Sequence, residues 1–335
     1  MRARTEIVQP DGRHVYLYGD FAPAPADYQA PAMPAGLYQR RWNPLRREWV
    51  LVAASRQGRT FLPERRECPL CPSKPGHSSE IPASAFQAAV FENRFPSMLP
   101  AAAGGSCEVV VYTGEHDGAF TTLGPEQLQL LGEVWTDRYA ELSARPGIRY
   151  VYIFENRGEQ VGVTLHHPHG QIYAYPFVPP VATTELRAHQ QGCRQCALVA
   201  DELRQKQRVL IDEGGLVAYV PGYARWPFEV HVAPSEHRPS LTDLGDAERL
   251  SLLRAMQRVA RCYDKLFEVP MPYMMAMHQA PTRPAPQAHL HVEFYPILRD
   301  RGKLKYLAGS ESGAGVFIND TLAEESSQRL RALLE

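Results

Sequence analysis

The segment from His166 to Tyr173 contains three side chains whose types and spacing suit chemistry on a phosphate group. His167, His169 and Gln171 alternate, so in an extended chain all three leave the same face. One imidazole can attack phosphorus, the amide can donate to a phosphate oxygen, and the other imidazole can hold a metal ion. The proline between the histidines lacks a backbone donor, which favours a strand end or a sheet edge. The pattern predicts histidine chemistry on a phosphate, with a histidine-rich strand end as the plain alternative.

Two sets of cysteine and histidine residues have the composition of zinc sites. Each combines a Cys-x-x-Cys pair, a lone histidine 45 or 41 residues later, and the first histidine of a His-x-His sequence. Two thiolates and two imidazoles suit tetrahedral zinc. Prolines crowd the first cysteine pair, which argues against a redox role, while two free buried cysteines are the alternative for the second pair. The sets are Cys68, Cys71, His116 and His167, and Cys193, Cys196, His237 and His289.

The order of these residues repeats along the chain with a nearly constant offset, from 68 to 193, from 116 to 237 and from 167 to 289. The stretches between them repeat as well. An apolar strand leads to the lone histidine, an amphipathic helix and a second apolar strand follow, and the His-x-His strand closes the series. This duplication predicts an α+β fold. The expected elements, in chain order, are residues 107–112, 128–142, 149–154 and 167–173, and then 228–234, 252–266, 272–277 and 289–295.

Length and composition narrow the possible functions. The 335 residues are 44% hydrophobic, with a formal net charge of −1 and no dense run of lysine or arginine, so no nucleic acid partner is expected. No apolar run approaches the roughly 18 residues that a membrane span requires. The first residues lack the apolar core of a signal peptide. We therefore expect a cytoplasmic protein, in which Cys-x-x-Cys pairs point to metal binding.

The sequence divides into three parts. Residues 1–35 lie outside the repeat and contain the stretch FAPAPADYQAPAMPAG, so we expect an extended arm without its own core. Residues 36–180 form the first half, which carries the HPHGQ sequence. Residues 181–335 form the second half, which carries the second metal set.

Seven motifs resemble those of the galactose-1-phosphate uridylyltransferase family, and they occur in the family's order from about residue 36 to the end. They are NPLRREWVLVAASRQGR at 43–59, CPLC at 68–71, NRFPS at 93–97, FENRG at 154–158, HPHGQIY at 167–173, MHQAP at 277–281 and HVEFYP at 291–296. The resemblance implies two histidine-triad-like halves, with helices packed on mixed or antiparallel sheets. It also implies a homodimer whose active sites take residues from both subunits.

The implied reaction exchanges uridylyl groups between UDP-glucose and galactose 1-phosphate, in galactose metabolism. By resemblance, His169 attacks the α-phosphorus of UDP-glucose and glucose 1-phosphate leaves. Galactose 1-phosphate then takes the uridylyl group from the histidine, which gives UDP-galactose and predicts ping-pong kinetics. Histidine suits this task because its ordinary pKa of about 6.5 leaves the imidazole neutral at pH 7. Gln171 is implied as a donor to a non-bridging phosphate oxygen.

The resemblance also implies which residues bind the substrates. Two arginines contact the nucleotide phosphates, two asparagines contact uridine or phosphate, a threonine stands where many members have serine, and a lysine and a glutamate contact the hexose across the dimer. In that order they are Arg56, Arg59, Asn93, Asn156, Thr164, Lys305 and Glu311. Near the C-terminus the chain departs from one branch, because Phe317 or Ile318 takes the place of a sugar-facing glutamine.

The second metal site has another interpretation. One branch of the family binds a second metal ion through a glutamate and three histidines, and the matching residues here are Glu185, His278, His291 and Glu293. This oxygen-rich set suits iron better than zinc. The set containing Cys193 is favoured, which gives two zinc ions per chain, and iron at the second site is the alternative.

Two other functions remain open from the sequence. A nucleotide-sugar or dinucleotide phosphorylase would use the same histidine with inorganic phosphate as the acceptor. A zinc-stabilised nucleotide-binding module of the histidine-triad type is the alternative without catalysis.

Overall fold

The computed structural model describes residues 2–334, and their contacts divide the chain into two compact units. Unit 1 contains the residues up to Ile153 together with 164–184 and 281–284. Unit 2 contains residues 154–163, 185–280 and those from Ala285 onward. Each unit is therefore discontinuous in sequence. Among residues 2–334, no helix is long and apolar enough to cross a membrane.

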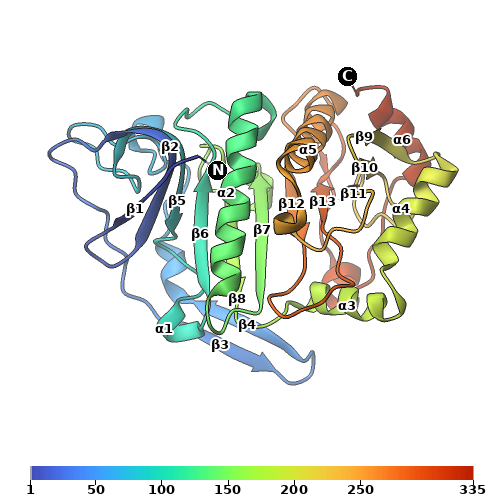
Figure 1. Ribbon diagram of the computed structural model, residues 1–335, viewed down its shortest axis with the longest axis horizontal. Helices are drawn as coiled ribbons and strands as arrows, with labels where there is room; N and C mark the ends of the chain where they lie inside the picture. Colours follow the sequence, from blue (N-terminus) through green and yellow to red (C-terminus); the bar gives the residue numbers. More distant parts are fainter. Residues whose placement is uncertain (1, 335) are drawn as a thin grey trace. The chain divides into compact units, whose positions relative to one another are not determined.

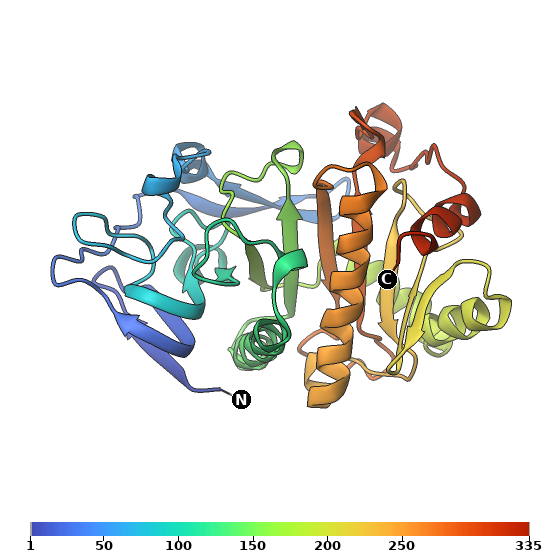
Figure 2. The same ribbon diagram turned by 90° about the horizontal axis from the view of Figure 1, so that it is seen from above.

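The strands of unit 1 follow the order β1-β2-β5-β6-β8-β7, and the pairs from β1 to β8 are antiparallel. One long helix, α2 (Pro125–Ala144), lies across a face of these strands (Figures 1 and 2). The strands are β1 (Arg4–Val8), β2 (His14–Pro23), β5 (Ala83–Glu92), β6 (Ser106–Val111), β8 (His169–Tyr175) and β7 (Tyr150–Arg157), whose last four residues belong to unit 2.

The α2 helix starts at Pro125, a residue type that favours the first turn of a helix. Pro125 occupies the first helical turn, where the missing N–H leaves no hydrogen bond unmade. The expected apolar stripe faces the protein interior, since Leu128, Leu131 and Trp135 are at most 2% exposed. Burial of such a stripe, more than helix propensity, holds a helix of this kind in place.

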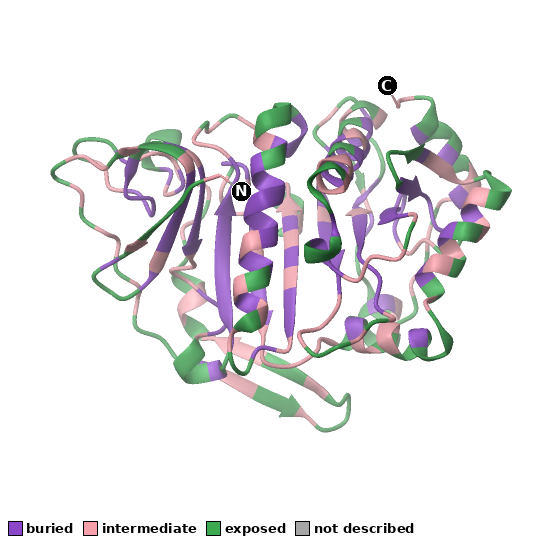
Figure 3. Cartoon of the chain, viewed as in Figure 1, coloured by how far each residue is buried: buried purple, intermediate pink, exposed green. Residues whose placement is uncertain are grey.

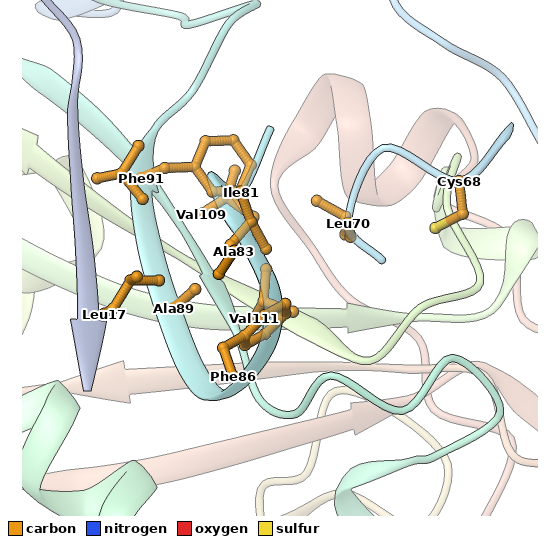
Figure 4. Close-up of a cluster of buried hydrophobic side chains, with 11 residues drawn as sticks. Leu17, Cys68, Leu70, Ile81, Ala83, Phe86, Ala89, Phe91, Val109 and Val111 are labelled. Atoms are coloured by element: carbon orange, nitrogen blue, oxygen red, sulfur yellow. The ribbon is translucent and has the colours of Figure 1, made fainter. Parts of the chain in front are cut away.

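A cluster of buried apolar side chains joins the strands of unit 1 to the loop that begins at Cys68 (Figure 4). Leu17 of β2, Phe91 of β5 and Val109 of β6 are part of this cluster. Cys68 and Leu70 from the loop are each 1% exposed and pack with them. The first cysteine pair is therefore anchored in the core and is not on a free surface loop.

The first 35 residues differ from the expected extended arm. Residues 4–23 form β1 and β2, and only residues 24–37 are extended without strand pairing. Both faces of β2 are covered. Val15 and Leu17 are fully buried in the cluster of Figure 4, and the guanidinium of Arg138 on α2 lies 3.9 Å from the ring centre of Tyr16. The free energy gained by burying apolar side chains on both faces of β2 exceeds the conformational entropy that an unpacked arm would keep.

A separate two-stranded antiparallel sheet in unit 1 is formed by β3 (Tyr38–Asn43) and β4 (Glu48–Ala53), with Trp42 opposite Trp49. This hairpin is mostly exposed or half-buried, whereas β6 is buried throughout (Figure 3). The short 3₁₀ helix η1 (Ala54–Gly58) follows it directly. The hairpin therefore leads the chain straight into the segment that carries Arg56 and Arg59.

Unit 2 repeats the central arrangement of unit 1. Its strand order is β12-β13-β11-β10-β9, and α5 packs on β10 and β11. The order β11-β13-β12 matches β6-β8-β7, and α5 follows β11 as α2 follows β6, so the duplicated α+β fold is confirmed. The elements are β9 (Val209–Glu213), β10 (Leu216–Tyr219), β11 (Val230–Pro234), α5 (Asp246–Leu266), β12 (Tyr273–His278) and β13 (His291–Pro296).

Besides five 3₁₀ helices of three residues each, residues 2–334 contain several other short elements. They are α1 (Pro100–Ala103), α3 (Pro180–Ala188), α4 (Arg194–Gln205), the hairpin β14 (Leu298–Asp300) with β15 (Lys303–Leu304), the π-helix η7 (Ser310–Ala314) and α6 (Ala323–Arg331). In unit 2, α4 and α6 both pack against β9.

Candidate active site and metal clusters

The strand β8 presents the predicted catalytic side chains on one face. His169 lies opposite Val111 of β6, and Gln171 lies opposite Val109. Both side chains are half-buried, while the residues between and after them, Gly170 and Ile172, are fully buried on the opposite face. The strand begins directly after the proline of the HPHGQ sequence, so the missing backbone donor interrupts no ladder.

A single hydrogen bond fixes the imidazole of His169. Its Nδ1 lies 2.7 Å from the carbonyl oxygen of His167, and because a carbonyl only accepts, Nδ1 carries the proton. The other ring nitrogen, Nε2, then has a free lone pair. Burial lowers the pKa of His169, and the hydrogen bond to His167 opposes this effect only in part. The ring is therefore neutral and oriented at pH 7, as a nucleophile requires.

The first predicted zinc set comes together in unit 1. The four ligand atoms of Cys68, Cys71, His116 and His167 lie within 4.8 Å of one another. Sulfur-to-Nδ1 distances are 3.2 Å for Cys71 with His116, 3.5 Å for Cys71 with His167 and 3.9 Å for Cys68 with His167. Ordinary Zn–S and Zn–N bonds at a tetrahedral angle place such atoms about 3.6 Å apart. The residues therefore fit zinc.

The second predicted set comes together in unit 2 with the same geometry. The sulfur atom of Cys196 lies 3.4 Å from Nδ1 of His237 and 3.3 Å from Nδ1 of His289, and that of Cys193 lies 3.4 Å from Nδ1 of His289. Cys193 also stands at the N-cap of α4, where its sulfur accepts a hydrogen bond from the N–H of Cys196. The pair is thus positioned by a helix start, and the four residues also fit zinc.

Backbone carbonyls orient the metal-facing histidines. Nε2 of His167 lies 2.7 Å from the carbonyl oxygen of Thr113, and Nε2 of His289 lies 3.1 Å from that of Pro234. Each carbonyl accepts the Nε2 proton, which leaves Nδ1 free to bind a metal ion. Sequence reasoning missed Thr113, and no signal could have found it, because any residue type offers the same carbonyl.

The third set, which the sequence offered as an alternative second site, also assembles in unit 2. The ligand atoms of Glu185, His278, His291 and Glu293 lie within 4.8 Å of one another, with Nδ1 of His278 3.1 Å from Glu185. This set shares no residue with the Cys193 set, so the two do not compete. Burial alone would raise the pKa of Glu293, but the imidazoles of His231 and His278 outweigh it and hold that pKa well below its usual value.

The third cluster occupies the position in unit 2 that the catalytic face occupies in unit 1. On β13, His291, Glu293 and Tyr295 alternate as His169, Gln171 and Tyr173 do on β8. Nδ1 of His291 also lies 2.9 Å from the carbonyl oxygen of His289. The decisive difference is the carboxylate of Glu293 in place of the Gln171 amide, because it repels a phosphate and attracts a cation.

The predicted phosphate-binding arginines lie beside a cavity of about 790 Å³, whose lining includes Arg56, Gln57, Arg59 and Phe61. Arg56 donates a hydrogen bond of 2.8 Å to the carbonyl oxygen of Phe95. The side chain of Arg59 is exposed. Both guanidinium groups are therefore placed at a hollow in unit 1 where an anion can enter.

Three more predicted substrate-binding residues are placed by the structure as follows. The side-chain oxygen of Asn93 accepts a hydrogen bond of 2.8 Å from the N–H of Phe95, which shapes the NRFPS turn. The carbonyl oxygen of Thr164 accepts a bond of 2.8 Å from the N–H of Leu62. Asn156 lies half-buried on the part of β7 that belongs to unit 2.

The two predicted hexose contacts bind each other. Nζ of Lys305 lies 2.8 Å from the carboxylate of Glu311, and both side chains are about 5% exposed. The same carboxylate accepts bonds from the N–H groups of Ala308 and Ile318, so it closes the loop between them. Of the two residues at the departure noted in the sequence, Phe317 packs on Trp226, whereas Ile318 is 56% exposed.

A duplicated α+β fold that presents an oriented histidine and an amide on one strand has the arrangement expected of an enzyme that transfers a group through histidine. Residues 100–179 match the N-terminal domain of galactose-1-phosphate uridyl transferase, and residues 184–335 match its C-terminal domain. The chain belongs to the galactose-1-phosphate uridylyltransferase family.

Individual relatives agree with this assignment. The galactose-1-phosphate uridylyltransferase of Thermotoga maritima is 37% identical over 88% of this chain and 98% of its own. A solved structure titled "Structure of uridylyltransferase" has a TM-score of 0.80, 33% identity, and covers 89% of this chain and 98% of its own. The ADP-glucose phosphorylase from Arabidopsis thaliana shares the fold, with a TM-score of 0.69 and 21% identity over 88% of this chain and 98% of its own.

Proposed function

We propose that this chain is a nucleotidyltransferase that exchanges uridylyl groups between UDP-glucose and galactose 1-phosphate. Membership of the galactose-1-phosphate uridylyltransferase family supports the substrates and the reaction class. The observation that carries the chemistry is the bond from Nδ1 of His169 to the carbonyl oxygen of His167, since it leaves Nε2 unprotonated on a fixed ring.

The reaction runs in two displacements. Nε2 of His169 attacks the α-phosphorus of UDP-glucose, a phosphorus–nitrogen bond forms, and the bond to the departing glucose 1-phosphate breaks. A phosphate oxygen of galactose 1-phosphate then attacks the same phosphorus, which forms UDP-galactose and returns the free imidazole. The amide of Gln171 donates to a non-bridging oxygen as charge gathers there. We assign Arg56 and Arg59 to the nucleotide phosphates. We assign Asn93 and Asn156 to contacts with uridine or phosphate, and Thr164 to substrate binding.

Zinc fits the two thiolate clusters, and we assign it there as a structural ion. Four protein ligands close each site and leave no position for substrate. In unit 1 the cluster fixes His167, whose carbonyl oxygen in turn orients His169. The oxygen-rich cluster around Glu185 suits a harder ion such as iron, and it does not displace zinc from the Cys193 cluster because no residue is shared.

We further assign Lys305 and Glu311 to the hexose site of a homodimer. Their ion pair is almost buried, but residues 305–318 around it include the exposed side chains of Tyr306 (72%), Val316 (59%) and Ile318 (56%). Exposed apolar groups of this size in one loop suit a protein partner. Size measurement in solution should therefore give a dimer, and Ile318→Glu should weaken it.

The test of the function is incubation with UDP-glucose in the absence of an acceptor. Release of one glucose 1-phosphate per active site, followed by turnover when galactose 1-phosphate is added, supports the uridylyl-histidine route. Turnover with inorganic phosphate but not with galactose 1-phosphate would show a phosphorylase. Binding of UDP-glucose with no release at all would show a binding module.

A further inference from the structure

The positive charge of this protein is concentrated in one short stretch. Residues 40–66, here called the arginine segment, contain eight arginines and two glutamates, which gives a formal charge of +6. The whole chain carries −1, so all other residues together carry −7. The arginines come in pairs or singly, three to nine residues apart, which is why no dense basic run is visible in the sequence. The fold brings them into one region of unit 1.

The arginine segment borders the catalytic strand at both of its ends. After β8, the ring of Phe177 lies 6.3 Å from that of Trp49 on β4. Before β8, the carbonyl oxygen of Thr164 accepts a hydrogen bond from the N–H of Leu62. Between these two contacts the segment forms the cavity that Arg56 and Arg59 line. Its charge is thus placed around the entrance to the proposed nucleotide site.

Two of the hairpin arginines, Arg40 and Arg41, contact neutral side chains. Arg41 donates two hydrogen bonds to the neutral amide of Gln39, and the guanidinium of Arg40 lies 4.7 Å from the ring centre of Trp49. Arg46 is 57% exposed, with Glu48 at 3.9 Å, the limit of an ion pair. Because Gln39 and Trp49 are neutral, these contacts do not cancel the charges of Arg41 and Arg40. Arg40 and Arg41 lie on β3, and Arg46 and Arg47 lie in the turn before β4, so one short hairpin carries four positive charges and the single carboxylate of Glu48.

We propose that the arginine segment is an electrostatic entry surface that draws anionic nucleotide sugars and sugar phosphates toward the cavity. In this proposal, which rests on the proposed function, Arg41, Arg46 and Arg47 act at a distance and do not contact bound substrate. Every substrate and product of the reaction is an anion. A surface of one sign beside a low-dielectric wall focuses the field and accelerates the association of small ions about 10- to 1000-fold at low salt. At 0.1 M salt, the attraction between exposed charges more than roughly 10 Å apart is largely screened.

The experiment measures how fast UDP associates with three full-length variants, by stopped-flow fluorescence between 10 and 500 mM NaCl. The first carries Arg41→Gln, Arg46→Gln and Arg47→Gln. The second carries lysine at the same positions and keeps the charge. The third is a matched control, which loses three exposed arginines of α4 and α5 in unit 2: Arg204→Gln, Arg254→Gln and Arg261→Gln.

The proposal expects the first variant to bind UDP about tenfold more slowly at 10 mM salt, with a flatter salt dependence that meets the wild type at 500 mM. The lysine variant and the unit 2 control should match the wild type, and association of uncharged uridine should be the same in all four proteins. Equal UDP rates and salt slopes in the first variant and the wild type would overturn it. A different outcome is that the UDP rates follow this pattern but the wild type releases no glucose 1-phosphate from UDP-glucose. That outcome would reject the proposed function and would still support the entry surface.

Discussion

The carbonyl oxygen of His167 accepts a hydrogen bond of 2.7 Å from Nδ1 of His169, so the proposed zinc ligand and the proposed nucleophile are linked through a single backbone group. His167 is itself held on both sides of its ring, by Cys71 at 3.5 Å and by the carbonyl oxygen of Thr113 at 2.7 Å. Any change that moves His167 therefore moves the hydrogen-bond acceptor that orients His169. Small displacements of a reacting group are costly in rate.

Replacement of the proposed nucleophile tests covalent catalysis through His169. His169→Ala should lower turnover by more than about 100-fold, because the proposed covalent intermediate forms on the imidazole of His169. The fold and the metal content should stay as in the wild type, since His169 belongs to none of the three metal clusters. His169→Gly with added imidazole should recover part of the first displacement. The neighbouring exposed His166→Ala is the control, and activity above about a hundredth in His169→Ala would contradict covalent catalysis.

Gln171 should contribute through its donor and not through packing. Gln171→Ala is expected to slow uridylyl transfer by about 10²- to 10³-fold, the cost of one lost donor to a developing charge. Gln171→Glu places at this position the residue that unit 2 has at Glu293, and it should be slower still because a carboxylate repels the phosphate. Single-turnover rates with UDP-glucose measure both. Similar rates in all three proteins would make Gln171 a packing residue.

The sequence was most informative where side-chain type and spacing repeat. The repeated order of cysteines, histidines, strands and helix in the two halves predicted the duplicated α+β fold, and the topology confirms it. The same offset predicted which cysteines and histidines meet, and the structure brings both sets together. Periodicity is visible in sequence because it reflects which face of an element is buried. Metal binding and the catalytic roles stay predictions.

The sequence was least informative where structure depends on groups that every residue carries or on distant packing. The carbonyl oxygen of Thr113 has no signature of its own. The strand β2 was missed because its alanine- and proline-rich continuation dominated the composition, although the run from His14 to Tyr18 is rich in β-forming residues. The pairing of Lys305 with Glu311 could not be foreseen either, because two residues six apart in a loop meet only through its fold.

Metal analysis separates the three clusters. Purified protein should contain two zinc ions per chain, and Cys193→Ser should lower this to one, because a serine hydroxyl is a far weaker zinc ligand than a thiolate. Cys262→Ser is the matched control, since that thiol is buried in α5 and belongs to no cluster. Any iron present should survive Cys193→Ser and disappear in Glu185→Gln. One zinc ion with iron, unchanged in Cys193→Ser, would contradict zinc in the second thiolate cluster.

Stability should depend on Glu141 in a particular pH range. Burial alone would raise the pKa of Glu141, but hydrogen bonds from Arg138, Arg145 and Arg4 outweigh it and lower the pKa from 4.5 to about 2. A carboxylate with a depressed pKa stabilises the folded state above the unfolded pKa and loses that contribution as pH falls toward the folded one. The stability difference between the wild type and Glu141→Gln in urea unfolding should therefore shrink between pH 4.5 and 2. A constant difference over this range would exclude the role.

The buried ion pair beneath α2 should matter far more than pairs on the surface. Arg138 and Glu108 have fully buried side chains joined at 2.7 Å, whereas Arg65 and Asp117 meet at the same distance with both side chains about 70% exposed. Removing one partner of a buried pair leaves the other charge unpaired in a medium of low dielectric, which lowers the free energy of unfolding by about 3–5 kcal/mol. The loss in free energy of unfolding for Glu108→Gln should lie near the lower end of this range, about 3 kcal/mol, because Glu141 still pairs with Arg138. Asp117→Asn, the exposed control, should cost less than about 1 kcal/mol. Urea unfolding measures both, and a Glu108→Gln loss as small as that of the control would mean that Arg138 reaches water in the folded protein.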